Sequence, residues 1–315
     1  MYNRQSMTAL LSAFVRAYHA ERSDDPFFAD SKARELMTET EYEAIKGYIL
    51  GGIDCLAPEK KGSFGIDVET LDCLINTHLA PTPLARAKYC EDSLKSAVRT
   101  GCGQYVILGA GYDTFAFRKT EQGEKLTVFE VDHPLTQQDK AVRIKRAGLK
   151  MPPNLRFVPV DFEKDDLEEK LTAAGFDRRK KSFFSWLGVS YYLSGEQIDA
   201  MLSSLTALSS DGSTLLFDFA DENLFSSPVR RVQSMLSMAE AAGEPMKSCF
   251  AYNELERLLE KYGFLIYDLL GERDIQERFF AHRKDGLKAF EHINFALTVF
   301  KKQVFGGAAP ACKKI

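Results

Sequence analysis

The sequence predicts an α/β protein with a mostly parallel β-sheet covered by helices on both faces. Short apolar runs rich in β-branched and aromatic residues recur from residue 104 onward, and amphipathic segments separate most of them. A chain that forms two parallel strands needs a crossover of about a dozen residues or more, usually a helix, to return to the end of the sheet where the first strand began. The 315 residues are also enough to bury the core of one large domain.

The first hundred residues precede this alternation and are predicted to be helical. Apolar side chains recur at helical spacing over 8–22, and a further helix is predicted over 30–37 with Asp30 or Ser31 as its N-cap. The stretch 47–65 is rich in glycine, which is typical of an irregular connection.

Seven runs in the remainder of the chain are predicted as strands. They cover residues 104–108, 126–131, 155–160, 182–186, 213–219, 264–267 and 292–300. Amphipathic segments over 197–208 and 253–262 are each long enough for a crossover helix. The last run has no helix after it, which favours an inserted antiparallel strand at the edge of the sheet.

The connection over 222–250 is too long to join a strand to a helix directly. It carries a helical pattern of its own over 229–242, which Gly243 closes. Because an insertion of this length after a late strand is where an α/β enzyme builds a cover over its substrate, we expect a helical cap here.

The composition disfavours several classes of protein. Lysine and arginine total 41 and aspartate and glutamate 45, a net charge of −4, so no overall positive field attracts nucleic acid. Six cysteines without a C-x-x-C pair predict neither a metal site nor a disulfide framework, and they favour a reducing cytoplasm. The chain has no signal-peptide pattern and no apolar run of about 18 residues, so we expect neither secretion nor a membrane-spanning helix.

The loop after the first predicted strand is a glycine-rich turn. In a doubly wound sheet, ligands bind at the carboxyl ends of the strands, so the loops there are the candidate site. Gly109 and Gly111 permit a tight turn and a close approach of ligand to backbone, although a glycine turn without a ligand remains the alternative. The dinucleotide fingerprint has glycine or alanine where this chain has Thr114, which argues against a nicotinamide cofactor.

Two carboxylates end the second predicted strand, about 20 residues beyond the glycines. Glu130 and Asp132 are placed to accept hydrogen bonds from the ribose hydroxyls of an adenosine. Strand alternation puts both on the same face or edge, so one of them is alternatively a solvated helix cap. Asp132 is favoured because the chain turns directly after it, and His133 is interpreted as a turn residue rather than a catalyst.

The loops after the third and fourth strands carry aromatic side chains. Asp161 is suited to accept a hydrogen bond from the adenine amine while Phe162 covers the ring. The alternative is that Asp161 caps a helix over 163–171. Tyr191 and Tyr192 lie beside the expected cleft, where they either face the substrate or form an aromatic pair in the core.

Several further motifs accompany these loops in a fixed order. They are Thr8-Ala-Leu, Arg16-Ala-Tyr, Asp25-Pro-Phe-Phe-Ala-Asp30, Thr82-Pro-Leu-Ala-Arg86, Leu108-Gly-Ala-Gly-Tyr-Asp-Thr114, Phe117-Arg118, Phe129-Glu-Val-Asp-His-Pro134, Lys140, Val160-Asp-Phe162, Trp186-Leu-Gly-Val-Ser-Tyr-Tyr-Leu-Ser194 and Ala242-Gly-Glu-Pro245. Together they resemble the S-adenosylmethionine-dependent methyltransferases of the leucine carboxyl methyltransferase type, a group that includes bacterial O-methyltransferases labelled as polyketide-associated. The resemblance covers nearly the whole chain.

The resemblance implies a Rossmann-like, seven-stranded methyltransferase sheet with a helical N-terminal extension and an inserted helical cap. The extension or lid would span 1–100, and the S-adenosylmethionine-binding domain would span 101–315 with its cap over 222–250. The cofactor contacts that it implies are Arg86, Gly109, Ala110, Gly111, Asp113, Glu130, Asp132, Asp161, Phe162 and Leu187.

Specific roles follow from the same resemblance. Arg86 would pair with the cofactor's carboxylate, which its guanidinium fork suits, whereas without the resemblance it reads equally as a surface arginine on a helix. The two glycines would pass under the methionine part, Asp132 would hold the ribose, and Asp161 with Phe162 would frame the adenine. Relatives that methylate a protein C-terminus, and many bacterial members, have a glutamate where this chain has Leu187, so a carboxylate-dependent contact there is in doubt.

The expected activity is direct in-line methyl transfer to an oxygen of a small molecule, either a hydroxyl or a carboxylate. A carboxylate acceptor needs no base, and the sequence assigns no base for a hydroxyl. Tyr191 and Tyr192 are the catalytic candidates, through substrate contact, in a pocket closed by 8–37, 47–65 and 222–250. The alternatives are methylation of a protein C-terminal carboxyl group, a noncatalytic cofactor-binding protein and, less favoured, an NAD-dependent oxidoreductase. No metal, nucleic acid or membrane is expected.

Overall fold

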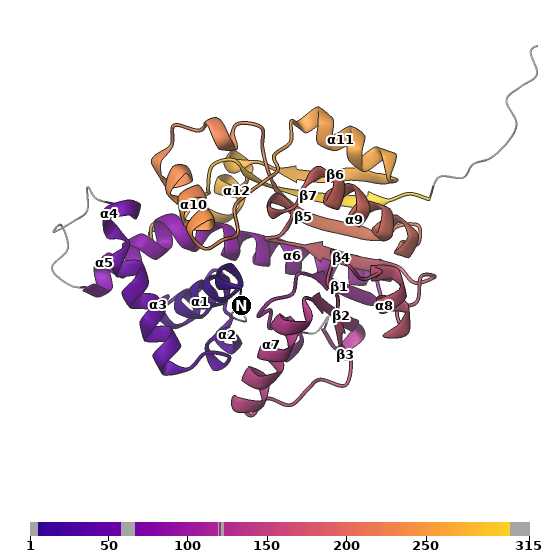
Figure 1. Ribbon diagram of the computed structural model, residues 1–315, viewed down its shortest axis with the longest axis horizontal. Helices are drawn as coiled ribbons and strands as arrows, with labels where there is room; N and C mark the ends of the chain where they lie inside the picture. The colour runs from indigo at the N-terminus through magenta and orange to yellow at the C-terminus, as the bar shows by residue number, and fades with distance from the viewer. Residues whose placement is uncertain (1–5, 58–66, 119, 121–122, 303–315) are drawn as a thin grey trace, which may run out of the picture.

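A seven-stranded mixed sheet forms the centre of the computed structural model, which describes residues 6–57, 67–118, 120 and 123–302 (Figure 1). The strands are β1 Gln104–Leu108, β2 Thr127–Asp132, β3 Leu155–Pro159, β4 Ser182–Trp186, β5 Thr214–Ala220, β6 Phe264–Leu270 and β7 Ile293–Phe300. Their order across the sheet is β3-β2-β1-β4-β5-β7-β6. The predicted α/β class and its seven strands are therefore confirmed.

The last strand corrects one prediction about the sheet. β7 is antiparallel and inserted, as expected, but it lies between β5 and β6 rather than at the edge. Its neighbour β6 forms the edge and carries exposed side chains, with Tyr267 76% exposed. The physical reason is burial: β7 is apolar enough to be covered on both faces, whereas the more polar β6 tolerates a solvated edge.

Helices cover both faces of the sheet. They are α1 Met7–Arg22, α2 Ser31–Glu35, α3 Glu39–Gly51, α4 Ile53–Leu56, α5 Asp67–Leu74, α6 Pro81–Arg99, α7 Pro134–Arg146, α8 Leu167–Ala173, α9 Gly195–Leu208, α10 Arg230–Ala241, α11 Tyr252–Lys261 and α12 Glu272–Ile275. One apolar core joins a sheet face to α8, α9 and α11, and a second core joins the opposite face to α1, α6 and α10. β1 and β4 are buried along their whole length because both faces are covered.

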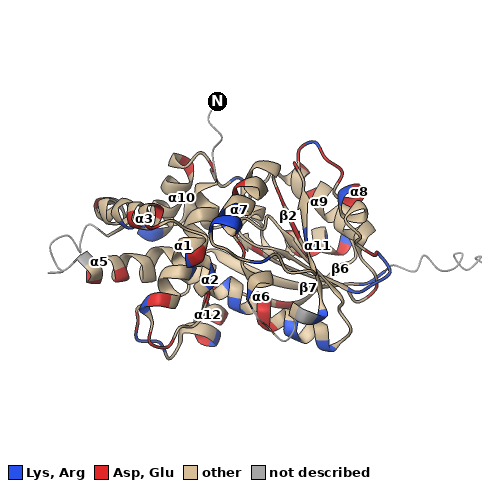
Figure 2. Ribbon diagram, turned by 90° about the horizontal axis from the view of Figure 1, so that it is seen from below, with Lys and Arg blue, Asp and Glu red and all other residues tan. Residues whose placement is uncertain are grey.

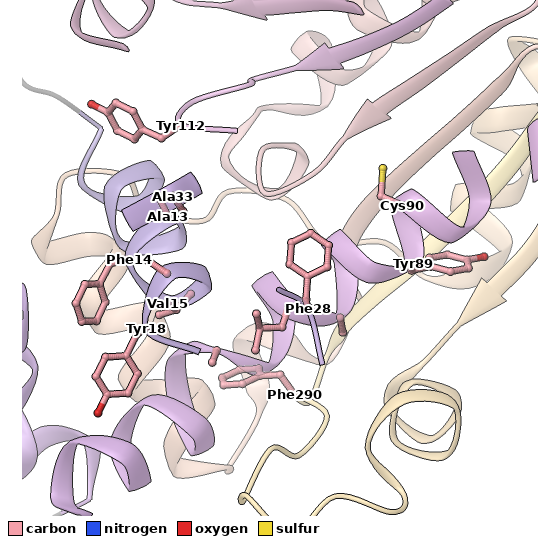
Figure 3. Close-up of a cluster of buried hydrophobic side chains, with 14 of the residues drawn as sticks. Ala13, Phe14, Val15, Tyr18, Phe28, Ala33, Tyr89, Cys90, Tyr112 and Phe290 are labelled. Carbon is pink, nitrogen blue, oxygen red and sulfur yellow. The ribbon is translucent and has the colours of Figure 1, made fainter. Parts of the chain in front are cut away.

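The N-terminal helices pack as one layer over the second core. Ser6 caps α1 and Asp30 caps α2, so the helix predicted over 30–37 is present in shortened form with the expected cap. Figure 3 shows side chains from α1, α2 and α6 in one cluster, with Ala13 close to Ala33. The small side chains let the two helices approach closely.

The glycine-rich stretch 47–65 is partly helical, which corrects the prediction of an irregular connection. α3 continues to Gly51 and α4 follows it directly, while 58–65 lie outside the described residues. A capping box between Thr38 and Glu41 starts α3, and its buried Ile45 and Ile49 anchor it. Packing of this apolar face outweighs the low helix propensity of the glycines.

The predicted cap is a helix that meets the N-terminal layer. α10 ends before Gly243, whose φ of 78° stops the helix as expected. Directly after it, the carboxylate of Glu244 accepts a hydrogen bond of 2.5 Å from the Thr8 hydroxyl at the start of α1. Figure 1 shows α1, α3 and α10 together on the side of the molecule away from α8, α9 and α11.

Charged residues of both signs are interspersed over the helices. In Figure 2 both acidic and basic positions occur along α6 and α8, and the formal net charge is −4. No helix in the described part of the chain combines the length and the apolar character needed to cross a bilayer.

Acidification is expected to destabilise the N-terminal layer through His19. This buried side chain accepts a hydrogen bond of 2.9 Å from Phe27 N at Nε2, and burial, assisted by Arg283, lowers its pKa to about 4. Between about pH 6.5 and 4 the unfolded chain therefore binds the extra proton, and stability falls by about 3 kcal/mol over that window. His19→Gln keeps a hydrogen-bond acceptor but does not titrate in this range. As the pH falls through the window, its free energy of unfolding, measured with urea, should rise by this amount relative to that of the wild type. A difference that stays constant from pH 7 to pH 4 would contradict the assignment.

Candidate functional site

A cavity of about 1010 Å³ lies at the carboxyl ends of β1, β2 and β4. Its walls come from the strand-end loops, α1, α6, α10 and the segment that follows α10. Most of the sequence-predicted site residues line it. These are Arg86, Gly109, Ala110, Gly111, Asp113, Asp132, Phe162, Leu187, Tyr191 and Tyr192.

The glycine turn after β1 adopts the backbone that only glycine accepts easily. Gly109 and Gly111 have φ values of 71° and 48°. A Cβ on Gly109 would lie 2.5 Å from Val189 Cγ2, and one on Gly111 would lie 3.1 Å from Ala9 Cβ on α1. The turn is thus enclosed by the loop after β4 and by the first helix, which leaves its backbone along the cavity.

Asp132 ends β2 and holds the glycine turn in place. One carboxylate oxygen accepts a hydrogen bond of 2.5 Å from Gly111 N, and the other accepts one of 2.7 Å from His133 N. Burial raises the pKa of Asp132, and these two N–H groups oppose the rise. Each oxygen retains a lone pair, so the carboxylate is able to accept further hydrogen bonds from hydroxyl groups in the cavity.

Glu130 is not brought to the cavity. It is fully buried and forms an ion pair with Lys140 of α7, which is equally buried, while Gln137 donates to its backbone oxygen at 2.7 Å. Burial raises the pKa of Glu130, and Lys140 limits the rise. The side chain therefore ties α7 to β2 beneath Asp132 instead of facing a ligand.

The loop after β3 separates its two predicted residues. Phe162 lines the cavity, whereas the Asp161 carboxylate accepts hydrogen bonds from Lys164 Nζ at 2.6 Å and Glu163 N at 3.1 Å. The helix expected over 163–171 begins only at Leu167, because Asp166 supplies its cap. Asp161 thus starts a turn, and the alternative in which it caps that helix is wrong.

His133 caps α7, in line with its interpretation as a turn residue. Its Nδ1 accepts from Leu135 N at 3.3 Å, and its ring reaches the rim of the cavity, where Nε2 lies 3.9 Å from Asp161 Oδ2.

Arg86 points from α6 into a buried polar cluster at the cavity wall. Its Nη1 donates to Asp218 Oδ2 at 2.9 Å and to the Tyr191 hydroxyl at 3.1 Å, and its Nη2 lies 3.4 Å from Ser12 Oγ. The side chain is 14% exposed, and that of Asp218 is fully buried. The interpretation of Arg86 as a surface arginine is therefore wrong.

The two tyrosines after β4 have different surroundings. Tyr191 is buried, with its hydroxyl bonded within the Arg86 cluster, and Tyr192 is half-buried against it with ring centroids 4.8 Å apart. Burial raises the pKa of Tyr192 to about 12 and raises the pKa of Tyr191 well above its ordinary value. Both phenols therefore stay protonated at neutral pH, so they are suited to donate hydrogen bonds and not to act as bases. Leu187 lies on the same wall as a partly buried apolar residue.

Sequence reasoning missed Asp218 and the apolar contribution of the cap. Asp218 is a single carboxylate within an otherwise apolar strand, a signal that was present in the sequence. Met235, Met238 and Met246 line the cavity from α10 and the segment after it. Their spacing alone did not distinguish a cavity lining from core packing.

Comparison with known proteins places the chain among methyltransferases. The sequence model described as leucine carboxyl methyltransferase matches residues 9–206. YktD of Bacillus subtilis (strain 168), named as an S-adenosyl-L-methionine-dependent methyltransferase, is 45% identical over 302 residues, which are 95% of this chain and 99% of that protein. A protein of the same description from Mycolicibacterium paratuberculosis (strain ATCC BAA-968 / K-10) is 29% identical over 74% of this chain and 71% of its own length.

Solved structures share the fold at low sequence identity. A crystal structure from Thermobifida fusca YX, described as a methyltransferase, has a TM-score of 0.57 at 13% identity and covers 96% of this chain and 97% of its own. A DUF574 family protein from Streptomyces avermitilis MA-4680 has a TM-score of 0.51 at 14% identity, with coverage of 82% and 96%.

Proposed function

The chain belongs to the leucine carboxyl methyltransferase family of S-adenosylmethionine-dependent enzymes, and from that premise we propose that it methylates an oxygen of a small molecule. The acceptor group is a hydroxyl or a carboxylate, and transfer is direct and in line. The observation that carries the proposal is one continuous cavity, which joins the glycine turn to an apolar chamber under the cap. Methyltransferase activity and S-adenosylmethionine as cofactor follow from the family.

The residues along the cavity fit this cofactor. Gly109 and Gly111 present backbone where a Cβ would meet a neighbour, Arg86 offers a cation to a carboxylate, and Asp132 offers acceptors to the ribose hydroxyls. Phe162 would cover the adenine ring. Ala110, Asp113 and Leu187 complete the proposed contacts. Glu130 and Asp161 do not line the cavity, so they would act indirectly, Glu130 by fixing α7 and Asp161 by fixing the loop after β3.

The cofactor, when bound, supplies a methyl group already activated on a sulfonium, so the protein's tasks are alignment and exclusion of water. The chain performs the first task with fixed groups, because Asp132 and Asp218 hold the glycine turn and Arg86 respectively. For the second, we propose that the helical N-terminal extension, up to about residue 100, and the cap over 222–250 act as a lid over the sheet domain that starts near residue 101. The Thr8–Glu244 hydrogen bond, which joins the two parts of this lid, supports that proposal.

The apolar chamber supports a small organic acceptor. Its lining includes Leu79, Met235, Met238, Met246 and Phe290, and methionine side chains adapt to irregular shapes. Tyr192 would donate a hydrogen bond to the acceptor from the wall. Leu187 counts against the alternative of protein C-terminal methylation, because the resemblance implies a glutamate at this position in relatives with that activity. The dispersed cysteines support a cytoplasmic location.

The test is transfer of a labelled methyl group from S-adenosylmethionine to a panel of phenols, alcohols, carboxylic acids and a peptide with a free C-terminal leucine. We expect label on a small molecule together with an equal amount of S-adenosylhomocysteine. Release of the label by mild base distinguishes a methyl ester from a methyl ether. Transfer to the peptide alone would contradict the proposal and favour protein carboxyl methylation.

A further inference from the structure

Asp218 is a buried carboxylate in the middle of an apolar strand. Leu215, Leu216, Phe217 and Phe219 surround it in β5, and none of its side chain is exposed. Removing a charge from water is costly, and a buried ion pair adds little net stability over apolar residues of similar size. A structural role alone therefore gives a weak account of an ion pair at this position.

The Asp218 carboxylate joins β5 to two other elements, α6 and the loop after β4. Oδ1 accepts a hydrogen bond of 2.6 Å from Gly188 N in the loop after β4. Oδ2 accepts one of 2.9 Å from Arg86 Nη1 on α6 and a longer one of 3.4 Å from the Tyr191 hydroxyl. One side chain thus fixes both the arginine and the loop beside it.

Gly188 fixes the guanidinium from a second direction. With φ at +74°, its Cα faces the planar group so closely that an added Cβ would lie 2.5 Å from Nη2, 2.6 Å from Nη1 and 2.8 Å from Cζ. Asp218 thus holds one edge of the guanidinium, and Gly188 covers one of its faces. Nη2 is not bonded to Asp218; it contacts Ser12 Oγ at 3.4 Å, and both Arg86 and Ser12 line the cavity.

We propose that Asp218 is a positioning residue that, together with Gly188, orients the Arg86 guanidinium to receive the amino-acid carboxylate of the cofactor. The inference rests on the cofactor contact proposed above for Arg86. A guanidinium binds a carboxylate well only when its N–H groups are aligned with the two oxygens, and an untethered arginine loses rotamer entropy when it binds. Asp218 removes that loss before the cofactor arrives.

The experiment compares two ligands in calorimetric titrations. S-adenosylhomocysteine carries the amino-acid end, whereas 5′-methylthioadenosine has the same nucleoside and sulfur without it. For Asp218→Asn, we expect the affinity for S-adenosylhomocysteine to fall about 10-fold or more, and that for methylthioadenosine to stay within about 2-fold. Thr298→Val is the matched control, because this buried hydroxyl bonds Leu215 O at 3.1 Å in the same part of the sheet without touching Arg86.

A second variant keeps the test independent of the charge change. Gly188→Ala should show the same selective loss, because its Cβ would displace the guanidinium. Its control is Gly101→Ala, which has a φ of +97° but no atom within 4 Å of the added Cβ. In turnover assays, both Asp218→Asn and Gly188→Ala should raise KM for S-adenosylmethionine more than they lower kcat.

The outcomes separate this inference from the proposed function. If the wild type binds both ligands and Asp218→Asn weakens them equally, or weakens neither, the positioning role is wrong while the function stands. If the wild type binds the two ligands with equal affinity, the Arg86 contact is wrong and the inference falls with it. Wild-type protein that binds neither ligand would contradict the proposed function itself.

Discussion

Replacing Arg86 with alanine is expected to lower the free energy of unfolding by about 3 kcal/mol or more. The substitution leaves the Asp218 carboxylate, whose side chain is fully buried, without its cation. Gly188 N and the Tyr191 hydroxyl still donate to it, but they carry no compensating charge. Urea unfolding followed by circular dichroism, with linear extrapolation to water, measures the loss.

The double variant Arg86→Ala, Asp218→Asn provides the control for this prediction. Asparagine removes the buried charge and keeps an oxygen for Gly188 N, so the double variant should be more stable than Arg86→Ala alone. If the two variants unfold at the same urea concentration, an unpaired charge is not the cause. Arg86→Ala should also weaken binding of S-adenosylmethionine by roughly 1 to 3 kcal/mol.

Replacing Asp132 with alanine is expected to weaken binding of S-adenosylmethionine by about 1 to 3 kcal/mol, the cost of losing a charged hydrogen-bond partner. The variant loses the proposed acceptor for the ribose hydroxyls. It also releases Gly111 N and His133 N, so the glycine turn is no longer held against β2. Calorimetric titration with S-adenosylhomocysteine measures the effect without turnover.

Asp166→Ala is the matched control for Asp132→Ala. Asp166, in the connection between β3 and α8, also accepts a backbone hydrogen bond, of 3.0 Å from Glu169 N, but it is not part of the cavity wall. It should lose the stability of a helix cap, about 1 kcal/mol, with unchanged affinity. Equal ligand affinities in the two variants would contradict a role of Asp132 in binding.

Most of the sheet was predictable from local pattern. β1 and β4 have the predicted bounds, because each is a short, mostly apolar run near residues that interrupt it: Gly103 and Gly109 flank β1, Lys181 precedes β4 and Gly188 lies two residues after its end. The prediction for β6 ended at residue 267 because Asp268 interrupts the apolar run, whereas the strand continues to Leu270. In the fold that carboxylate accepts a hydrogen bond of 2.9 Å from Arg278 Nη1 and one of 2.8 Å from the Tyr89 hydroxyl, a partner 179 positions away that no local window contains.

The candidate site likewise contains residues whose role follows from local sequence and residues whose role depends on tertiary contacts. The turn chemistry of Gly109 and Gly111 and the position of Asp132 at a strand end are local properties, and the sequence predicted all three at the cavity. For Glu130, the sequence left a ribose contact and a solvated helix cap as alternatives. Its burial was decided by Lys140, which reaches it from the following helix.

The sequence by itself determined the α/β class, the seven strands and the loops at which a ligand would bind, because periodicity and turn residues act over a few positions. Only the tertiary structure decided that the last strand lies inside the sheet, that Glu130 is buried in an ion pair with Lys140, and that Asp218 holds Arg86. These outcomes depend on which buried charges and apolar faces find each other, and Arg86 and Asp218 meet across 132 positions of the chain.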